Sequence, residues 1–151
     1  INMCDEPSLL PSTLVGVVAQ RMVRRICTNC RTAYRPAPAE LTAYEEEMKQ
    51  TLPAFNKGTG CNLCAQTGYR GRTGLFEILV MSEEIRAMLL NRAGAGDIRA
   101  QSLKEGMINM RHDGMIKVAQ GITSISEVLR SVFSLNIGAR NQLRGNDDIP
   151  L

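Results

Sequence analysis

The chain has 151 residues and a mass of 16.6 kDa, enough for one ordinary domain or a small module beside a helical one, and too few for a complete large enzyme. Its hydrophobic content of 44% and charged content of 22% predict a packed core and not a disordered chain. Because only 4% of the residues are aromatic, we expect this core to be mainly aliphatic. The net charge of +3 is mild and by itself indicates neither nucleic acid nor membrane binding, and no apolar run approaches the roughly 18 to 20 residues that cross a bilayer.

The beginning of the chain predicts a helix followed by a short strand. It carries no initiator Met and no signal-peptide order of basic, apolar and small residues, so we expect a soluble, non-secreted piece of a longer protein. Pro11 suits a first helical turn, and apolar residues recur at helical spacing over 8–25, at Leu10, Leu14, Val17, Val18 and Met22. We expect the helix to change into a strand near Arg21, with "MVRRIC" at 22–27 as the strand.

The cysteine-bounded segment 27–64 is expected to hold one helix. The stretch "RPAPAE" supplies a rigid extended entry. The following "LTAYEEEMKQTL" places apolar residues on one helical face, at Leu41, Tyr44, Met48 and Leu52. Pro53 ends this helix, and "NKGTG" returns the chain by a loop to the second cysteine pair.

Charge is unevenly distributed along this part of the chain. Three acids follow a cluster of arginines that falls within positions 21–35, at Arg21, Arg24, Arg25, Arg31 and Arg35. The distribution predicts a polarised surface, which is either a solvated face or a docking surface for an acidic partner.

The remainder predicts one strand and then helices. The strand covers about 73–80, and from Asn136 onward the periodicity is lost, which predicts a tail. The helical segments are "SEEIRAMLLNR" capped by Ser82, "DIRAQSLKEG" capped by Asp97 and followed by Gly106, 108–120 closed by Gly121, and "SISEVLRSVF" with Ser124 and Glu127 at capping-box spacing. The expected fold class is α+β and mostly α, a helical bundle with a short strand pair and an inserted tetracysteine subdomain.

Two C-x-x-C pairs predict a metal site. Their members are Cys27 with Cys30 and Cys61 with Cys64. Each turn brings two thiolates to one point, and two such pairs fill the four corners of a tetrahedral Zn²⁺ site with no position left for a catalytic water. The intervening loop, 31–60, is longer than the usual spacing of about 15 to 20 residues. Closing a loop costs only about 0.6 kcal/mol more per doubling of its length, so a structural zinc site is still expected.

Other interpretations of the cysteines stay open. Disulfides need an oxidising compartment, which nothing in the sequence indicates. A thioredoxin-like redox pair needs one C-x-x-C at a strand-to-helix corner, and an iron–sulfur cluster is possible because sulfur ligands alone do not select zinc. The remaining cysteine, Cys4, is expected to be a buried small apolar residue.

No catalytic constellation stands out. None of the lysines follows the glycine loop of a phosphate-binding motif, and "RAGAGD" at 92–97 is better explained as a turn between helices. His112 has Asp113 beside it, but adjacent residues on a helix point apart. We therefore expect this chain alone to catalyse nothing.

Three stretches together resemble one known family. They are "LVGVVAQRMVRRICTNC", "GCNLCAQTGYRGRTGLFEIL" and "HDGMIKVAQGITSISEVLR", within roughly 8–133. They are similar to the C-terminal part of the secretion traffic ATPases, which include general secretory pathway protein E and the type IV pilus assembly ATPase. The pattern C-x-x-C-x-x-T-G-Y-x-G-R-x-G is highly specific, and pilus retraction ATPases lack the tetracysteine insert.

The resemblance implies a parent protein that is a hexameric motor. Its ATP and Mg²⁺ would bind upstream of Ile1, and its partners would be other motor subunits and inner-membrane platform or linker proteins, with no nucleic acid and no small-molecule substrate for this chain. The parent would be cytoplasmic and peripheral at the bacterial inner membrane. The implied organisation is the end of the ATPase core at 1–26, the zinc subdomain at 27–72, a strand with C-terminal helices at 73–135, and a flexible tail at 136–151. Arg72 is expected to pair with Glu77 or with a backbone carbonyl.

We therefore expect a non-catalytic zinc-binding and assembly module of a type II secretion or type IV pilus assembly motor. A nucleic-acid-binding zinc ribbon is the alternative, since the arginines suit phosphates, although few aromatic residues are present for base stacking. A redox or chaperone-like protein is a third interpretation, for which reactive thiols of low pKa would be the sign.

Overall fold

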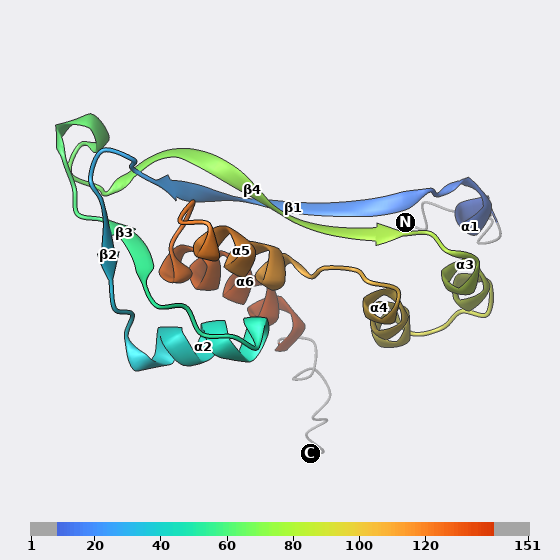
Figure 1. Cartoon of the computed structure of the whole chain (residues 1–151). Coiled ribbons are helices and arrows are strands. Elements are labelled where there is room, and N and C mark those ends of the chain that lie inside the picture. Colours follow the sequence, from blue (N-terminus) through green and yellow to red (C-terminus); the bar gives the residue numbers. More distant parts are fainter. Residues whose placement is uncertain (1–8, 141–151) are drawn as a thin grey trace, which may run out of the picture. The chain divides into compact units, whose positions relative to one another are not determined.

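The computed structural model describes residues 9–140 (Figure 1). Cys4 and the last part of the expected tail, 141–151, lie outside the described residues. The described chain forms two compact units: the first unit comprises 9–20 and 76–110, and the second unit comprises 21–75 and 111–140. Each unit is therefore discontinuous in sequence.

The expected strand pair is present and is longer than predicted. β1 (Gly16–Ile26) pairs with β4 (Tyr69–Val80), and the two arrows run in opposite directions in Figure 1. At Gly16 the backbones approach so closely that a Cβ would lie 2.8 Å from the carbonyl oxygen of Leu79. A larger residue at this position would push the two strands apart.

The helix predicted to run to about Arg21 is wrong, because α1 covers only Leu9–Thr13 and β1 begins soon after it. The apolar residues that suggested a helix include two β-branched valines, which favour a strand: Val17 and Val18. A short apolar run of this kind fits either period, and the partner strand decides between them.

The first unit also contains α3 (Glu83–Leu90) and α4 (Ala95–Lys104). Ser82 caps α3 as predicted, since its Oγ accepts a hydrogen bond from the Ile85 N–H at 3.1 Å. The cap predicted at Asp97 is wrong: α4 starts after Gly94, whose carbonyl accepts from the Asp97 N–H at 3.1 Å. Asp97 instead lies in the first turn, where the helix dipole favours its negative charge.

In the second unit, the cysteine-bounded segment contains a two-stranded antiparallel sheet. β2 (Arg31–Tyr34) pairs with β3 (Phe55–Gly58), with Tyr34 opposite Phe55. The sequence predicted a loop where β3 lies, because its glycine and polar residues do not favour a strand. Between the strands lies α2 (Pro38–Met48), which ends before the predicted stop at Pro53.

A small aromatic core holds α2 against this sheet. Tyr44 is fully buried, and its ring meets the Phe55 ring edge-on with centroids 5.0 Å apart. Lys49, which follows the last helical residue, adopts the left-handed conformation with φ 54°. This local C-cap ends the helix, so Leu52 lies outside the helical face on which we expected it.

Two C-terminal helices complete the second unit: α5 (Met110–Ala119) and α6 (Ile125–Arg140). They pack closely at Gly114, where a Cβ would lie 2.5 Å from a methyl group of Val128. Gly121 follows α5 with φ 69°, as the predicted helix stop requires. The buried side chains between these helices and the strands include Val23, Leu75, Met115, Ile125 and Val128.

The mixed α+β fold class is confirmed, with a second strand pair that we did not predict. The last helix, α6, continues to Arg140, beyond the point at which the sequence loses its periodicity. Within the described residues, 9–140, no helix combines the length and the apolar character needed to span a membrane.

Candidate metal centre

The first cysteine pair lies where β1 ends. Ile26 is the last residue of the strand, and Cys27 to Cys30 form the turn that leads into β2. The Cys27 N–H donates to the carbonyl oxygen of Gly68 at 2.9 Å, and the Thr59 N–H donates to that of Cys30 at 3.0 Å. Both ends of this turn are therefore fixed by backbone groups from the far side of the segment.

The second pair lies on a short 3₁₀ turn, Asn62–Cys64, which follows Cys61. Two residues after the turn have positive φ, Ala65 with 49° and Gln66 with 63°. This tight reversal directs backbone N–H groups at a sulfur: Cys64 Sγ accepts from the Cys61 N–H at 3.2 Å and from the Gly68 N–H at 3.3 Å. Such donors stabilise a thiolate, the form of cysteine that binds a metal.

The four predicted cysteines come together. All four Sγ atoms of Cys27, Cys30, Cys61 and Cys64 lie within 4.8 Å of one another. The Sγ atoms of Cys27 and Cys61 are 3.8 Å apart, those of Cys30 and Cys64 are 3.9 Å apart, and those of Cys61 and Cys64 are 3.7 Å apart. A tetrahedron with Zn–S bonds of about 2.3 Å has edges of about 3.8 Å, so the cluster fits a zinc ion.

The same distances distinguish the cluster from a disulfide pair. A bonded pair of sulfurs is about 2.05 Å apart, and all four cysteines are free thiols. Cys27, Cys30 and Cys64 are buried, and Cys61 packs against them. Four unpaired thiols gathered in one buried place have the chemistry of a soft metal site.

The surroundings act differently on the individual thiols. A hydrogen bond with the Asn29 side chain lowers the pKa of Cys61 to about 6, whereas burial raises the pKa of Cys30 to about 11. Burial also opposes ionisation of Cys64, but the N–H groups of Cys61 and Gly68 outweigh it, and its pKa is lowered. The second pair is therefore the better prepared of the two to present thiolates.

Glycines bring the two sides of the segment into contact. A Cβ at Gly58 would lie 1.9 Å from the carbonyl oxygen of Gly68, a distance no side chain can occupy. Gly68 itself has φ 76°. Thr67 stabilises the same turn, since its Oγ donates to the Cys64 carbonyl at 2.6 Å. The glycine-rich stretch after the second cysteine pair is thus part of the site's framework.

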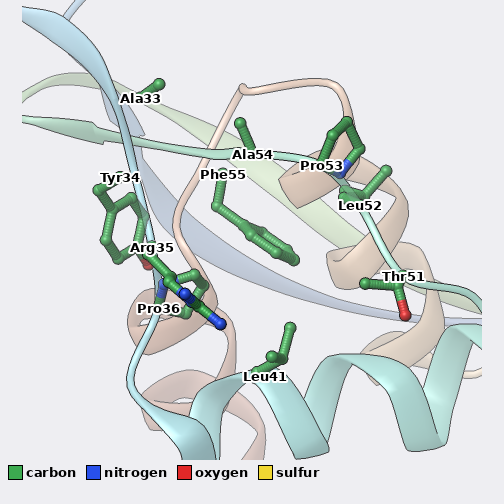
Figure 2. Close-up of a pocket in the computed structure, with 10 residues that line it drawn as sticks. All are labelled: Ala33, Tyr34, Arg35, Pro36, Leu41, Thr51, Leu52, Pro53, Ala54 and Phe55. Atoms are coloured by element: carbon green, nitrogen blue, oxygen red, sulfur yellow. The ribbon is translucent and has the colours of Figure 1, made fainter.

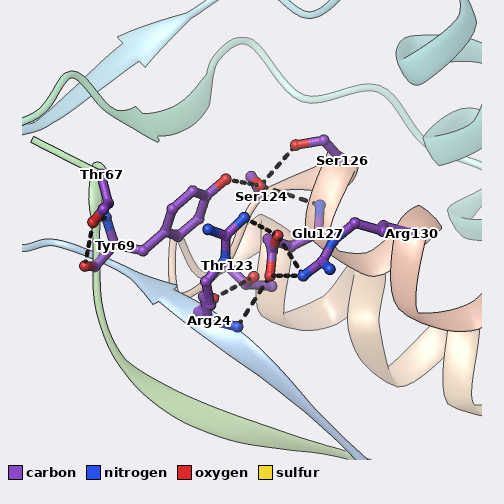
Figure 3. A network of polar contacts seen from close by, with 8 residues as sticks. All are labelled: Arg24, Thr67, Tyr69, Thr123, Ser124, Ser126, Glu127 and Arg130. Atoms are coloured by element: carbon purple, nitrogen blue, oxygen red, sulfur yellow. Dashed lines mark hydrogen bonds and ion pairs between the residues drawn. The ribbon is translucent and has the colours of Figure 1, made fainter.

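A polar network that the sequence analysis missed lies where β1, β4 and α6 meet (Figure 3). The Glu127 side chain is 3% exposed and accepts hydrogen bonds from the Arg24 guanidinium and, at 3.0 Å, from Arg130. The second carboxylate oxygen of Glu127 accepts a hydrogen bond from the backbone N–H of Arg24 at 3.2 Å. The Arg24 guanidinium also lies 4.2 Å from the ring centroid of Tyr69, whose hydroxyl is 2.7 Å from Ser124 Oγ.

The capping pattern gave only half of this network. Ser124 Oγ accepts from the Glu127 N–H at 3.3 Å, as a capping box requires. The Glu127 carboxylate, however, turns to Arg24, which is 103 positions away in sequence. A buried acid in the first turn of an amphipathic helix is the signal that indicates such a long-range partner.

Two further expectations concern side-chain pairs. Glu77, expected as a partner of Arg72, instead accepts from the Arg99 guanidinium and, at 3.0 Å, from the Met110 N–H. The adjacent pair that we considered and rejected as catalytic, His112 and Asp113, makes separate contacts: His112 Nδ1 lies 3.4 Å from a carboxylate oxygen of Glu47, and Asp113 bonds to Lys117.

Comparison with known proteins gives a family match over most of the chain. A family model described as "Type II/IV secretion system protein" matches residues 1–130. The type IV pilus assembly ATPase PilB of Thermus thermophilus is 38% identical over 129 residues, 85% of this chain and 14% of that protein. Type II secretion system protein E of Pseudomonas aeruginosa is 36% identical over 130 residues, 86% of this chain and 26% of that protein. The type II secretion system ATPase E of Vibrio cholerae is 36% identical over 129 residues, 85% of this chain and 25% of that protein. The chain therefore spans about a quarter or less of the length of these relatives.

Proposed function

Because this chain belongs to the type II/IV secretion system protein family, we propose that it is the C-terminal zinc-binding and assembly portion of a motor ATPase that drives type II secretion or type IV pilus assembly. The observation that carries the proposal is the cluster of four free thiols at the edge lengths of a zinc tetrahedron, inside a chain that matches this family.

In this proposal, Cys27, Cys30, Cys61 and Cys64 hold one Zn²⁺, which supplies a structural cross-link. Protein sulfurs fill all four positions, so no site remains for a water molecule and no hydrolytic role follows. The segment 27–64 has few buried apolar side chains outside Tyr44 and Phe55 among its described residues. Its folding would therefore depend on the metal, as in other small zinc modules.

The parent protein would supply everything catalytic. We propose that ATP and Mg²⁺ bind to parts of the parent that precede this chain, and that the parent forms a hexamer in the cytoplasm beside the inner membrane. The proposed division places the end of the ATPase core at 1–26, the zinc subdomain at 27–72, the strand with C-terminal helices at 73–135 and a tail after it. The partners would be neighbouring motor subunits and membrane-embedded platform or linker proteins of the same machine.

The alternative of a nucleic-acid-binding zinc ribbon has weaker support. Arg24, a member of the basic cluster, is already engaged by Glu127 and by the Tyr69 ring. Binding of DNA or RNA that weakens steeply with added salt would favour this alternative over the proposed function.

Native mass spectrometry of the purified chain tests the metal half of the proposal. We expect one zinc per chain, lost on treatment with a strong chelator, and the same stoichiometry in Cys4→Ser, which removes a thiol that is not a proposed ligand. Metal-free protein with a mass deficit of two disulfides would contradict it. The assembly half is tested in the parent protein, where Cys61→Ser should abolish secretion or piliation while Cys4→Ser leaves it intact.

A further inference from the structure

A groove lies in the second unit, at the end of the β2–β3 sheet that is remote from the cysteines. The walls are the end of β2, the start of β3, the first turns of α2 and the loop after α2 (Figure 2). Its volume is about 450 Å³, within the range of about 300 to 1,000 Å³ that is typical of ligand sites. The four cysteines do not line this groove, so the metal site does not account for it.

The floor of the groove is apolar, with one cation at its mouth. Leu41 and Leu52 supply hydrocarbon surface above the buried Phe55 ring, and Figure 2 shows the guanidinium of Arg35 extending between these side chains and the Tyr34 ring. Arg35 is exposed, and among residues 9–140 it has no hydrogen-bond or ion-pair partner. A guanidinium without a partner above an apolar floor suits a ligand that joins a carboxylate to an apolar side chain.

Charged side chains of both signs surround the groove. Near Arg35, the amino group of Lys57 lies 5.2 Å from the ring centroid of Tyr34, while burial and then the neighbouring Glu40 carboxylate raise the pKa of Tyr34 to about 12. At the other end, Thr51 donates to the carboxylate of Glu45 at 2.7 Å. Among the residues that line the groove, Arg35 is the charged one, so the negative charge of an occupant would pair with its guanidinium.

The chemistry favours a peptide over a polyanion. Nucleic acid binding draws on many phosphate contacts and on exposed aromatic platforms, whereas this groove offers one free guanidinium, and Phe55 is buried in its floor. Apolar pockets with a few convergent polar groups are typical of anchored side chains in peptide recognition.

We propose that this groove binds an acidic, apolar peptide segment of a protein partner, with an apolar side chain against Leu41 and Leu52 and a carboxylate paired to Arg35. The inference deepens the proposed function and rests on it, because it gives the chemical character of a component that the module contacts. It also assigns a role to Arg35, one member of the basic cluster.

The test uses the zinc-loaded chain of 151 residues and labelled peptides. Fluorescence anisotropy compares acetyl-Asp-Leu-Asp-Leu-amide with its Asn-Leu-Asn-Leu and Asp-Ser-Asp-Ser counterparts, so that charge and apolar character are removed separately. We expect only the first peptide to bind well, with amide shifts in ¹⁵N spectra at Ala33, Leu52 and Phe55. Equal binding of the three peptides, or shifts confined to other parts of the chain, would overturn the proposal.

Two variants locate the contact. Arg35→Ala should weaken binding at least about tenfold, as expected for loss of a charged hydrogen bond. Arg70→Ala removes the same charge from an exposed position outside the groove. This control loses only long-range attraction of the acidic peptide, so its affinity should change less than about twofold. Ala54→Trp fills the groove from its rim and should block binding without removing any charge. If Arg35→Ala binds like Arg70→Ala, the groove is not the site.

The outcomes separate this inference from the proposed function. The groove proposal is wrong if the groove variants keep one zinc and the native circular dichroism but bind the peptide as tightly as wild type does. The proposed metal module would be unaffected by that result. A chain that binds the peptide at Arg35 but holds no zinc contradicts the proposed function alone. Oligo(dT) or phosphatidylglycerol vesicles that bind more tightly than the peptide, with the same loss in Arg35→Ala, would replace the peptide with a phosphate-bearing partner.

Discussion

The buried carboxylate of Glu127 provides the sharpest test of how the second unit is held together. Glu127→Gln keeps the shape of the side chain and removes its charge. Burial of the carboxylate alone would raise its pKa, but hydrogen bonds from Arg24 and Arg130 outweigh burial and lower it from 4.5 to about 2. At about 1.4 kcal/mol per pKa unit, this difference corresponds to about 3 kcal/mol in favour of the folded state.

Exposure of the two arginines to solvent reduces this stabilisation. The Arg24 side chain is 46% exposed and that of Arg130 is 67% exposed, so water screens part of the attraction, and we expect Glu127→Gln to cost about 2 kcal/mol of unfolding free energy at pH 7. Because the folded state favours the carboxylate, the stabilisation is complete above about pH 4.5 and is lost as the pH falls toward about 2.

Urea unfolding followed by circular dichroism, with zinc in slight excess at pH 7, measures this cost. Glu84→Gln, on the exposed side of α3, is the matched control and should change the unfolding free energy by less than about 0.5 kcal/mol. A cost below about 0.5 kcal/mol for Glu127→Gln would refute the reasoning, because the network would then be an ordinary surface ion pair.

The other predictions concern the metal segment and the glycines. Cys61→Ser should lose zinc and make 27–64 sensitive to protease while α5 and α6 stay helical, which mass spectrometry and limited proteolysis would show; complete unfolding would mean that the two parts share one core. Gly58→Ala should lower zinc affinity at least about tenfold in competition with a chromophoric chelator, because its Cβ would collide with the Gly68 carbonyl 1.9 Å away, and unchanged affinity would show that the turn can yield. Gly96→Ala meets no atom within 4 Å and lies inside α4, so it should raise the unfolding free energy by about 0.5 to 1 kcal/mol; a loss of stability would argue against the helix there.

The cysteine cluster could be predicted from the sequence because its signal is local. Each C-x-x-C pair carries its own geometry, and only the closure of the loop between Cys30 and Cys61 had to be assumed. Helix caps such as Ser82 were predictable for the same reason, since a cap depends on a neighbour three positions away.

Features decided by distant partners were not predictable in this way. β1 is a strand because β4 pairs with it, and the apolar spacing around Val17 fits a helix equally well. β3 contains Asn56, Lys57 and Gly58, none of which favours a strand, and its pairing with β2 supplies the order. The Arg24–Glu127 contact likewise joins positions that no local pattern connects.

The hydrogen bond from the Cys27 N–H to the Gly68 carbonyl, at 2.9 Å, has a consequence for how such a segment is gained or lost. It means that the residues that enter and leave the metal segment are immediate neighbours in space. Insertions with adjacent ends disturb a host fold least, because the gap they leave can be closed by a short turn. Excising 28–67 would leave β1 and β4 to be joined as a simple hairpin. The excised piece would carry three of the four sulfurs, and the fourth, that of Cys27, would stay in the hairpin. The metal segment is thus transferable as a unit, provided that the recipient hairpin ends in a cysteine.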